Sequence, residues 1–339
     1  MRASYAVSSP LLMLATLIMG LAGVAGCDDR RLVYPPGCEH PAVVERCVDG
    51  WCEIPAGCYT NWVTPPVLWD LSGRSKDGLN SRPRFIRLTH AFIIQQTETM
   101  RGDFQRRMGY EPSPQGHGVS PKLPVPATWY EAAAYCNALS KEKGAPACYR
   151  CRGTTWRDLR CEVAPAYAGS AIYDCSGYRL PTRAEWRYAY RAGTLTYFYS
   201  GTPNLLGDYS PLADLIGWYG EEHGLPHPPA QKMKNAWGLY DMAGNLKEWG
   251  HDPGSEWDEH SNGIYPKGYE GPDPSIPPDV DPVSPVWNHT SYHIPYAPAM
   301  GGAVTDRAEQ LGYRSHKLEI KENGTCTVRC VRSRLSTPR

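Results

Sequence analysis

The sequence has no excess of charge of either sign, because its 339 residues include 35 Lys and Arg against 35 Asp and Glu. A chain with this balance sets up no overall field that attracts nucleic acid or an acidic membrane surface, and no nucleic-acid partner is expected. The sequence also has no Walker loop, dinucleotide-binding fingerprint or serine nucleophile elbow. Enzymes that depend on those motifs are therefore excluded.

Glycine and proline are abundant, at 33 and 32 residues. They interrupt regular elements and favour long connections between short helices and strands. The chain is long enough to bury a sizeable core and shows no internal repeat or heptad run. The composition therefore predicts one loop-rich domain.

The first 26 residues are predicted to be a signal peptide, with a positive charge at Arg2 and an uncharged, mostly apolar segment from Leu11 to Gly26 that is too short to span a bilayer comfortably. Val24 to Cys27 read VAGC and resemble the bacterial lipobox, in which the cysteine is lipidated and the chain is cut before it. We expect an exported protein anchored to a membrane of the cell envelope through Cys27. An ordinary secretory signal is the alternative, and the choice between inner and outer membrane stays open.

Export favours disulfides over reduced metal ligands for the twelve cysteines. Lipidation of Cys27 leaves eleven, an odd number, so at least one thiol stays outside the intrachain pairs. Four cysteines have the spacing C-x2-C-x9-C-x13-C, which in a cytosolic protein could be a zinc ribbon. Here we predict that a Cys151–Cys161 bond is nested within a Cys148–Cys175 bond, and the other connectivities stay open.

Several segments carry signals of local structure. Residues 27–51 are predicted to be a cysteine-containing tether, and residues 52–335 the folded domain. Two capping boxes, Thr128 with Glu131 and Thr182 with Glu185, predict helix starts, and a further helix is expected from a Thr99 cap to Gly109. Residues 263–298 contain nine prolines and are expected to form a surface excursion. Near the end of the chain, 326–334 alternate apolar and Arg positions, which predicts a strand.

Seven motifs in order resemble the sulfatase-modifying factor family, which includes the formylglycine-generating enzyme. They are IPAG, TET, PVPATWYEAAAYCNALS, GYRLPTRAEWRYAYRAGT, NAWGLYDMAGNLKEWG, MGG and VRCVRSR. The resemblance covers most of residues 52–335. It implies an α+β, C-type-lectin-like fold that is loop-rich, with short twisted strands and a few helices. It also implies a disulfide between Cys136 and Cys330, which closes a loop long enough to stabilise the fold by roughly 4 to 5 kcal/mol in the entropic model.

The resemblance further implies a structural calcium ion. Its ligands would be the side chains of Asp241 and Glu248 and the backbone carbonyls of Gly244 and Leu246. Calcium prefers six to eight oxygen ligands of these kinds. The alternative is that Asp241 caps a turn and Glu248 lies on a solvated strand face.

The family's copper(I) site has no counterpart in the sequence. The positions of its two copper-binding cysteines carry Asp306 and Leu311, its serine is replaced by Ala303, and its site tryptophan by Lys247. Copper(I) prefers soft thiolate ligands, so copper is not expected here. Asp306 with Arg307 is predicted to form a surface ion pair instead.

No cysteine occurs between Cys175 and Cys326. We predict that Cys326 pairs with the N-terminal cysteine strip rather than binding a metal. His251 and His260 lie in a Gly- and Pro-rich loop, which gives no support to an iron site.

The sequence therefore predicts an exported, lipid-anchored protein that keeps the family scaffold without its thiol oxidation site. A non-catalytic role in binding or assembly at the cell envelope follows, with an unknown envelope protein or glycan as partner. Trp287, Tyr292 and Tyr296 in the 263–298 excursion are the expected contact surface, and the alternative is that these aromatic side chains cover the core. The alternative is an oxidoreductase of the same family that uses different ligands, and a third hypothesis is an envelope hydrolase with an unrecognised site.

Overall fold

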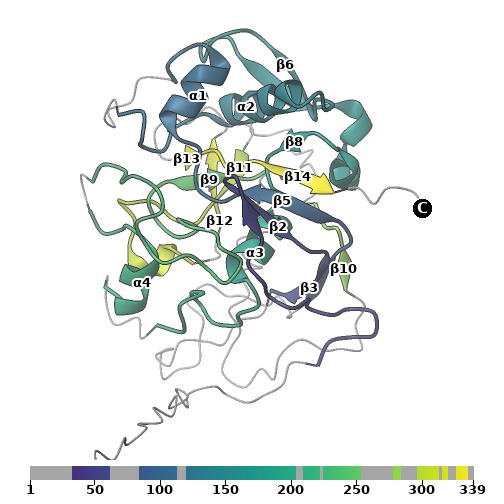
Figure 1. Ribbon diagram of the computed structural model, residues 1–339, viewed down its shortest axis with the longest axis vertical. Helices are drawn as coiled ribbons and strands as arrows, with labels where there is room; N and C mark the ends of the chain where they lie inside the picture. Colours follow the sequence, from purple (N-terminus) through teal and green to yellow (C-terminus); the bar gives the residue numbers. More distant parts are fainter. Residues whose placement is uncertain are drawn as a thin grey trace, which may run out of the picture. The chain divides into compact units, whose positions relative to one another are not determined.

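A computed structural model describes most of the domain (Figure 1). The described residues are 33–61, 84–112, 120–203, 209–221, 224–252, 278–283, 296–312, 315–319 and 326–334. Tyr34–Arg339 form one compact unit. In the described stretches, no helix has the length and apolar character needed to span a membrane. The predicted signal peptide and the predicted lipidation residue Cys27 lie outside the described residues.

A five-stranded antiparallel sheet brings the two ends of the domain together. Its strand order is β1 (Cys47–Val48), β2 (Trp51–Ile54), β5 (Ala91–Gln95), β14 (Val331–Arg334) and β8 (Tyr178–Arg179). Phe92 and Ile94 of β5 are fully buried while their neighbours are partly exposed, as the period of two requires. The last strand, β14, lies between β5 and β8, so the C-terminal segment is an interior part of the sheet.

The N-terminal strip is part of the domain, which corrects the prediction of a tether over 27–51. Its described residues include β1 and the start of β2, and Cys38 is fully buried. Disulfides join Cys38 to Cys58 and Cys47 to Cys52. The strip is too short for a core of its own, so its two covalent bonds and its sheet pairing hold it to the domain. Because Cys38 and Cys47 of the strip pair with Cys58 and Cys52, the predicted bond between the N-terminal cysteines and Cys326 is wrong.

Two smaller sheets complete the frame. One has the order β12 (Ser315–Glu319), β11 (Tyr296–Met300), β9 (Lys247–Trp249) and β13 (Cys326–Thr327), and the other has the order β10 (Asp279–Val280), β4 (Phe85–Leu88) and β3 (Gly57–Thr60). β10 and the start of β11 fall within the predicted 263–298 excursion, so these parts are sheet strands. Trp287 and Tyr292 lie outside the described residues, and Tyr296 is the first residue of β11.

The helices begin largely where the capping signals predict. They are α1 (Arg101–Met108), α2 (Trp129–Glu142), α3 (Arg183–Arg191) and α4 (Pro211–Ile216), with 3-10 turns at Pro165–Tyr167, Gly169–Asp174 and Ala308–Gln310. Both predicted capping boxes are present, at the starts of α2 and α3. The predicted Thr99 cap is wrong, because Met100 precedes α1 and the Thr99 hydroxyl donates to the Gln95 side chain. Gly109 ends α1 in the left-handed conformation.

A two-stranded hairpin, β6 (Tyr149–Arg152) and β7 (Arg160–Val163), lies beside α2 (Figure 1). The structure contains the Cys148–Cys175 and Cys151–Cys161 disulfides at this hairpin. It also contains the Cys136–Cys330 bond, which joins α2 to the residue before β14 across 194 positions of sequence. These bonds fix α2 and the hairpin to the central sheet.

Buried tryptophans mark the centre of the core. Trp186 of α3, Trp237 and Trp249 of β9 are fully buried. The indole of Trp249 donates to the carbonyl of Ala127 at 2.7 Å, and Trp237 contacts Tyr188 edge to face. Residues 235–250 therefore lie inside the domain, packed between α3 and the start of α2.

His251, which follows β9, is buried and neutral. Its Nδ1 lies 2.9 Å from the Tyr149 hydroxyl, and that hydroxyl accepts from the Leu180 amide at 3.1 Å, so its own proton is directed to His251. Burial, and secondarily the charge of Arg179, lower the pKa of His251 to about 3. The histidine is a structural part of the core, and in the described part of the chain it belongs to no group of three or more His, Cys, Asp or Glu side chains that could hold a metal ion.

We predict that His251 makes the protein less stable in mild acid. Below pH 6.5 the unfolded chain binds a proton at this residue while the folded protein does not, until about pH 3. The free energy of unfolding should therefore fall by up to about 1.4 kcal/mol per pH unit from this group. Urea unfolding at pH 7, 6, 5 and 4 should give a smaller pH dependence for His251→Gln, whose amide can still bond Tyr149. Equal slopes for both proteins would contradict the assignment.

Candidate functional site

The loop of residues 235–250 folds around special backbone conformations. Asn235 organises its start, since its side-chain oxygen accepts from the amides of Trp237 and Leu239 at 3.1 Å. Gly244 has φ of +73° and lies against the backbone of Trp218, where a Cβ would come within 2.3 Å of a carbonyl oxygen. Only glycine fits at that approach.

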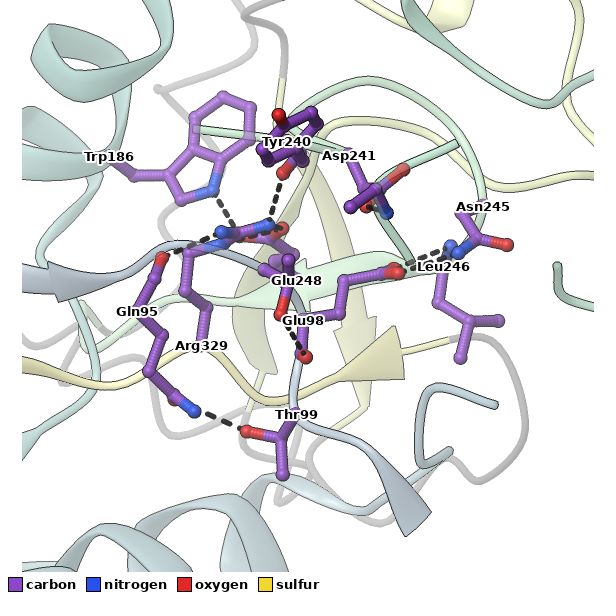
Figure 2. A network of polar contacts seen from close by, with 12 residues as sticks. Gln95, Glu98, Thr99, Trp186, Tyr240, Asp241, Asn245, Leu246, Glu248 and Arg329 are labelled. Carbon is purple, nitrogen blue, oxygen red and sulfur yellow. Dashed lines mark hydrogen bonds and ion pairs between the residues drawn. The ribbon is translucent and has the colours of Figure 1, made fainter. Parts of the chain in front are cut away.

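Glu248 of β9 is neutralised by Arg329, which lies just before β14 (Figure 2). Arg329 Nη2 and Nε donate to the Glu248 carboxylate at 2.7 and 2.8 Å, and the Trp186 indole donates to Oε2 at 2.6 Å. Both charged side chains are at most 1% exposed. Removing either partner of such a pair leaves a buried charge and costs about 3–5 kcal/mol.

Arg329 also connects three separate segments of the chain. Its Nη1 donates to the carbonyl of Gln95 at the end of β5, and its Nη2 donates to the carbonyl of Tyr240, both within 2.9 Å. The alternation at 326–334 predicted one strand, whereas the structure has two, β13 (Cys326–Thr327) and β14, and Arg329 lies in the break between them. The residue is buried because Glu248 supplies its counter-charge inside the domain.

Glu98 is a third buried carboxylate in this cluster, and sequence reasoning missed it. Its oxygens accept from the side chain of Asn245 at 2.6 Å and from the amide of Leu246 at 3.0 Å. Burial and the nearby carboxylates of Asp241 and Glu248 raise the pKa of Glu98 well above its usual value. The only available signal was its place in the TET motif, which precedes α1.

Asp241 lies on the same loop in the left-handed conformation, with φ of 54°. Its Oδ2 accepts from the amide of Ala230 at 2.6 Å, and the side chain is buried. Burial raises the pKa of Asp241, against the effects of that hydrogen bond and of Arg329. With all groups ionised, Glu98, Asp241 and Glu248 carry three negative charges, and Arg329 supplies one positive charge.

The structure places the four predicted calcium positions on one buried loop. Asp241, Gly244, Leu246 and Glu248 are all buried. Both carboxylate oxygens of Glu248 accept hydrogen bonds from Arg329, and Oε2 also accepts from Trp186. A bound ion would have to share this carboxylate with those donors. No group of three or more His, Cys, Asp or Glu side chains within the described stretches has metal-binding geometry. The donor types and the surplus negative charge nevertheless suit a hard cation next to Asp241.

Lys247, the residue before Glu248, forms an ion pair with Asp306. The Nζ of Lys247 lies 3.0 and 3.2 Å from the two carboxylate oxygens, and each side chain is only 12% exposed. The amide of Ala303 donates to the same carboxylate at 2.9 Å. The prediction of a surface pair between Asp306 and Arg307 missed this mostly buried partner on β9.

The other two replaced positions carry no polar side chain. Leu311 and Ala303 are buried, and Leu311 packs close to Gly302 and Gly217. The buried thiol of Cys326 belongs to none of the five disulfides, and β13 places it opposite Lys247 in the sheet register. The structure therefore brings Lys247, Ala303 and Asp306 together, with Cys326 as an unforeseen neighbour on the adjacent strand.

These residues do not fit a copper(I) ion. Copper(I) prefers paired thiolates, and the two positions carry a carboxylate that is already bound to an ammonium and an aliphatic side chain. The charge of Lys247 would also repel a cation. These side chains therefore do not provide the ligands that copper(I) needs.

The described residues 217–221 and 224–232 precede the loop of residues 235–250. The structure places an aromatic stack in this region. The imidazole of His227 lies parallel to the Trp218 indole, with ring centroids 3.8 Å apart. Lys232 Nζ lies 3.9 Å from the Trp218 ring centroid, and Glu221 pairs with His227 at 3.1 Å. The segment supports residues 235–250 directly, because Asn245 exchanges hydrogen bonds with the backbone of His227.

Comparison with known proteins identifies the scaffold. Residues 59–332 match the family model of the sulfatase-modifying factor enzyme 1-like domain. The chain is 32% identical over 190 residues to chaperone protein LppX of Paenibacillus barcinonensis, which covers 52% of this chain and 65% of the relative. It is 33% identical over 99 residues to the formylglycine-generating enzyme of Mycobacterium tuberculosis, covering 26% of this chain and 31% of that enzyme. The chain thus spans less than two thirds of either relative.

The fold is also found among solved structures. Treponema denticola variable protein 1 superposes with a TM-score of 0.55 at 21% identity, covering 82% of this chain and 95% of that one. This likeness concerns the fold alone. The chain therefore belongs to the sulfatase-modifying factor enzyme 1-like family, with the loop-rich α+β fold of the formylglycine-generating enzymes.

Proposed function

We propose that this protein is a non-catalytic binding or assembly protein of the bacterial cell envelope. The carrying observation is the Lys247–Asp306 ion pair at positions where the family's thiol oxidases use a tryptophan and a copper-binding cysteine. The two side chains satisfy each other, and Leu311 fills the second cysteine position with an aliphatic group. A domain with these residues keeps the scaffold without the soft ligands that oxidation chemistry needs.

Two further observations support this role. One relative is named as a chaperone, a role in assembly rather than in oxidation. The five disulfides are typical of an exported protein, because such bonds persist in oxidising compartments. We further propose that the chain is anchored to a membrane by a lipid on Cys27, as its VAGC sequence suggests.

The alternative function is an oxidoreductase with different ligands. One observation favours it, since the thiol of Cys326 lies on the strand next to Lys247. A single thiol beside an ammonium differs from the thiolate pair of the family. A copper experiment separates the two functions.

We predict that the protein binds no copper(I) and does not oxidise a sulfatase peptide. Anaerobic titration against a copper(I) chelator should give well under one equivalent of copper for the natural protein. The variant Asp306→Cys/Leu311→Cys, which supplies two thiols, should bind copper more tightly and serves as the positive comparison. Mass spectrometry should find no formylglycine in a cysteine-containing sulfatase peptide after incubation with the natural protein.

Stoichiometric copper binding by the natural protein, together with peptide oxidation, would contradict the proposal. If the variant Cys326→Ser then lost both properties, the oxidoreductase function would be supported. Thermal melting of each variant checks that it is folded.

We also propose that a calcium ion binds beside Asp241, where the buried carboxylates outnumber the one arginine. A ligand that binds only the folded protein at 100 times its dissociation constant stabilises it by about 2.7 kcal/mol. For a domain of this size the melting temperature should rise by roughly 5 °C or more on adding calcium and fall on chelation. Differential scanning calorimetry measures both changes.

Two matched variants sharpen the calcium test. Asp241→Asn tolerates the left-handed backbone and keeps an acceptor for the Ala230 amide, but it removes one charge. It should lose most of the calcium-dependent rise. Asp281→Asn is the control, because Asp281 also has a positive φ and accepts from a backbone amide, that of Thr89. An unchanged melting temperature for the natural protein on chelation would rule out the calcium site.

A further inference from the structure

The β6–β7 hairpin carries a concentration of arginines that lack carboxylate partners. Among the described residues, Arg152, Arg157 and Arg160 form no ion pair, although the chain as a whole has balanced charge. All three are exposed and fall within nine positions of sequence. Two other exposed arginines, Arg106 and Arg334, pair with carboxylates at 2.6 and 2.5 Å, and exposed arginines without an ion pair elsewhere in the described part of the chain, Arg46 and Arg87, are isolated in the sequence.

The strand register sets two of these arginines against each other. Arg150 lies opposite Glu162 and pairs with it at 2.6 Å, whereas the next position on the same face places Arg152 opposite Arg160. Like charges that face each other across two strands are destabilising. The arrangement therefore does not serve stability, and an anion between the two guanidinium groups would relieve it.

Covalent bonds hold this register. The Cys151–Cys161 bond lies one position from the arginine pair, and Cys148–Cys175 joins the base of the hairpin to the domain. On the other side of β6, the Asn137 amide of α2 donates to the carbonyl of Tyr149 at 2.8 Å. The hairpin cannot slide to a register that would separate the two arginines.

The turn of the hairpin leaves its positive charge uncompensated. Asp158 is used within the turn, where its carboxylate accepts from the amide and hydroxyl of Thr155 at 2.9 and 2.7 Å. These hydrogen bonds lower the pKa of Asp158, so it stays ionised and engaged in the turn. Gly153 closes the turn with φ of +92°, where a Cβ would collide with the Asp158 carbonyl. The nearby acid thus shapes the turn rather than pairing with an arginine.

Aromatic rings orient two of the arginines in advance. The guanidinium carbon of Arg157 lies 5.0 Å from the ring centroid of Trp156, and that of Arg160 lies 5.4 Å from the ring of Tyr130. Arg160 also donates to the carbonyl of Leu159 at 2.6 Å. Arginines held in this way lose less conformational freedom on binding an anion.

We propose that this hairpin binds an acidic polysaccharide through Arg152, Arg157 and Arg160. Guanidinium groups bind carboxylate and sulfate oxygens with paired hydrogen bonds, and an acidic polysaccharide offers such groups in series. The large exposed apolar side chains of the described residues all lie elsewhere, which disfavours insertion into a membrane. Strand addition by a peptide is disfavoured at β6, because Asn137 occupies the outer backbone groups of Tyr149. The proposal is independent of the copper and calcium questions, because it uses none of those residues.

Binding of the purified full-length protein to heparin and to polygalacturonate, by biolayer interferometry at low salt, tests the proposal. The variant Arg152→Gln/Arg160→Gln should bind both polymers at least tenfold more weakly. Its melting temperature should equal or exceed that of the natural protein, since a like-charge contact is removed. The control variant Arg106→Gln/Arg334→Gln loses the same two charges from exposed arginines that have partners, and it should stay within twofold of the natural protein.

Three results would overturn the proposal. The first is no binding of either polysaccharide by the natural protein. The second is an equal loss in both double variants, which would assign the binding to net charge alone. The third is tighter, hairpin-dependent binding of poly-L-glutamate or of phosphatidylglycerol vesicles, which would assign the surface to an acidic polypeptide or to a lipid membrane.

Discussion

The buried ion pair between Glu248 and Arg329 is the interaction on which the rest of the structure depends. It joins β9 to the segment that leads into the last strand, and Arg329 adds bonds to the carbonyls of Gln95 and Tyr240. Strands far apart in sequence therefore meet around one guanidinium group. Since loop-rich backbone has few regular hydrogen bonds of its own, a buried charge that needs several partners also specifies where those loops lie. The neighbouring Cys136–Cys330 bond fixes the same segment covalently to α2.

The residues that hold the fold together are different from the residues at the positions of the family's oxidation site. Glu248 and Lys247 are adjacent on β9, and Glu248 forms the buried pair with Arg329 while Lys247 pairs with Asp306, at a position where the family resemblance implies a copper-binding cysteine. A substitution at Lys247 does not change the contacts of Glu248, because successive strand residues point to opposite faces. A family domain can thus exchange its reactive groups for an ion pair and keep its core. The same separation lets functional surfaces arise elsewhere, as we infer for the arginines of the β6–β7 hairpin.

Local signals predicted local features well. The boxes at Thr128 and Thr182 have a defined spacing and a direct physical cause, so the starts of α2 and α3 could be read from the sequence. Export and spacing favoured the nested pair of disulfides around Cys151 while leaving other connectivities open, and the structure contains that pair. The family resemblance supplied the Cys136–Cys330 bond and the fold, which no periodicity in the chain indicates.

Features that depend on tertiary partners were missed. The alternation around Arg329 indicates a strand but not which side chains are buried, and the counter-charge of Glu248, 81 positions away, explains the burial of Arg329. The burial of Glu98 was missed for the same reason, because its hydrogen-bond partners Asn245 and Leu246 are far away in the sequence. The strip at 34–51 is too short for a core of its own, and its place in the sheet depends on cysteine pairings that spacing leaves open. The ion-pair partner of Asp306 is Lys247 on β9, and not the predicted Arg307, the next residue along the chain.

A crystal structure of the protein soaked with copper(I), with anomalous data collected at the copper edge, tests the central claim most directly. We expect clear density for Arg329 on Glu248, a direct contact between Lys247 and Asp306, and no anomalous peak beside them. A copper peak bound by Cys326 with Asp306 displaced from Lys247 would contradict the claim that this domain keeps its scaffold without its oxidation site.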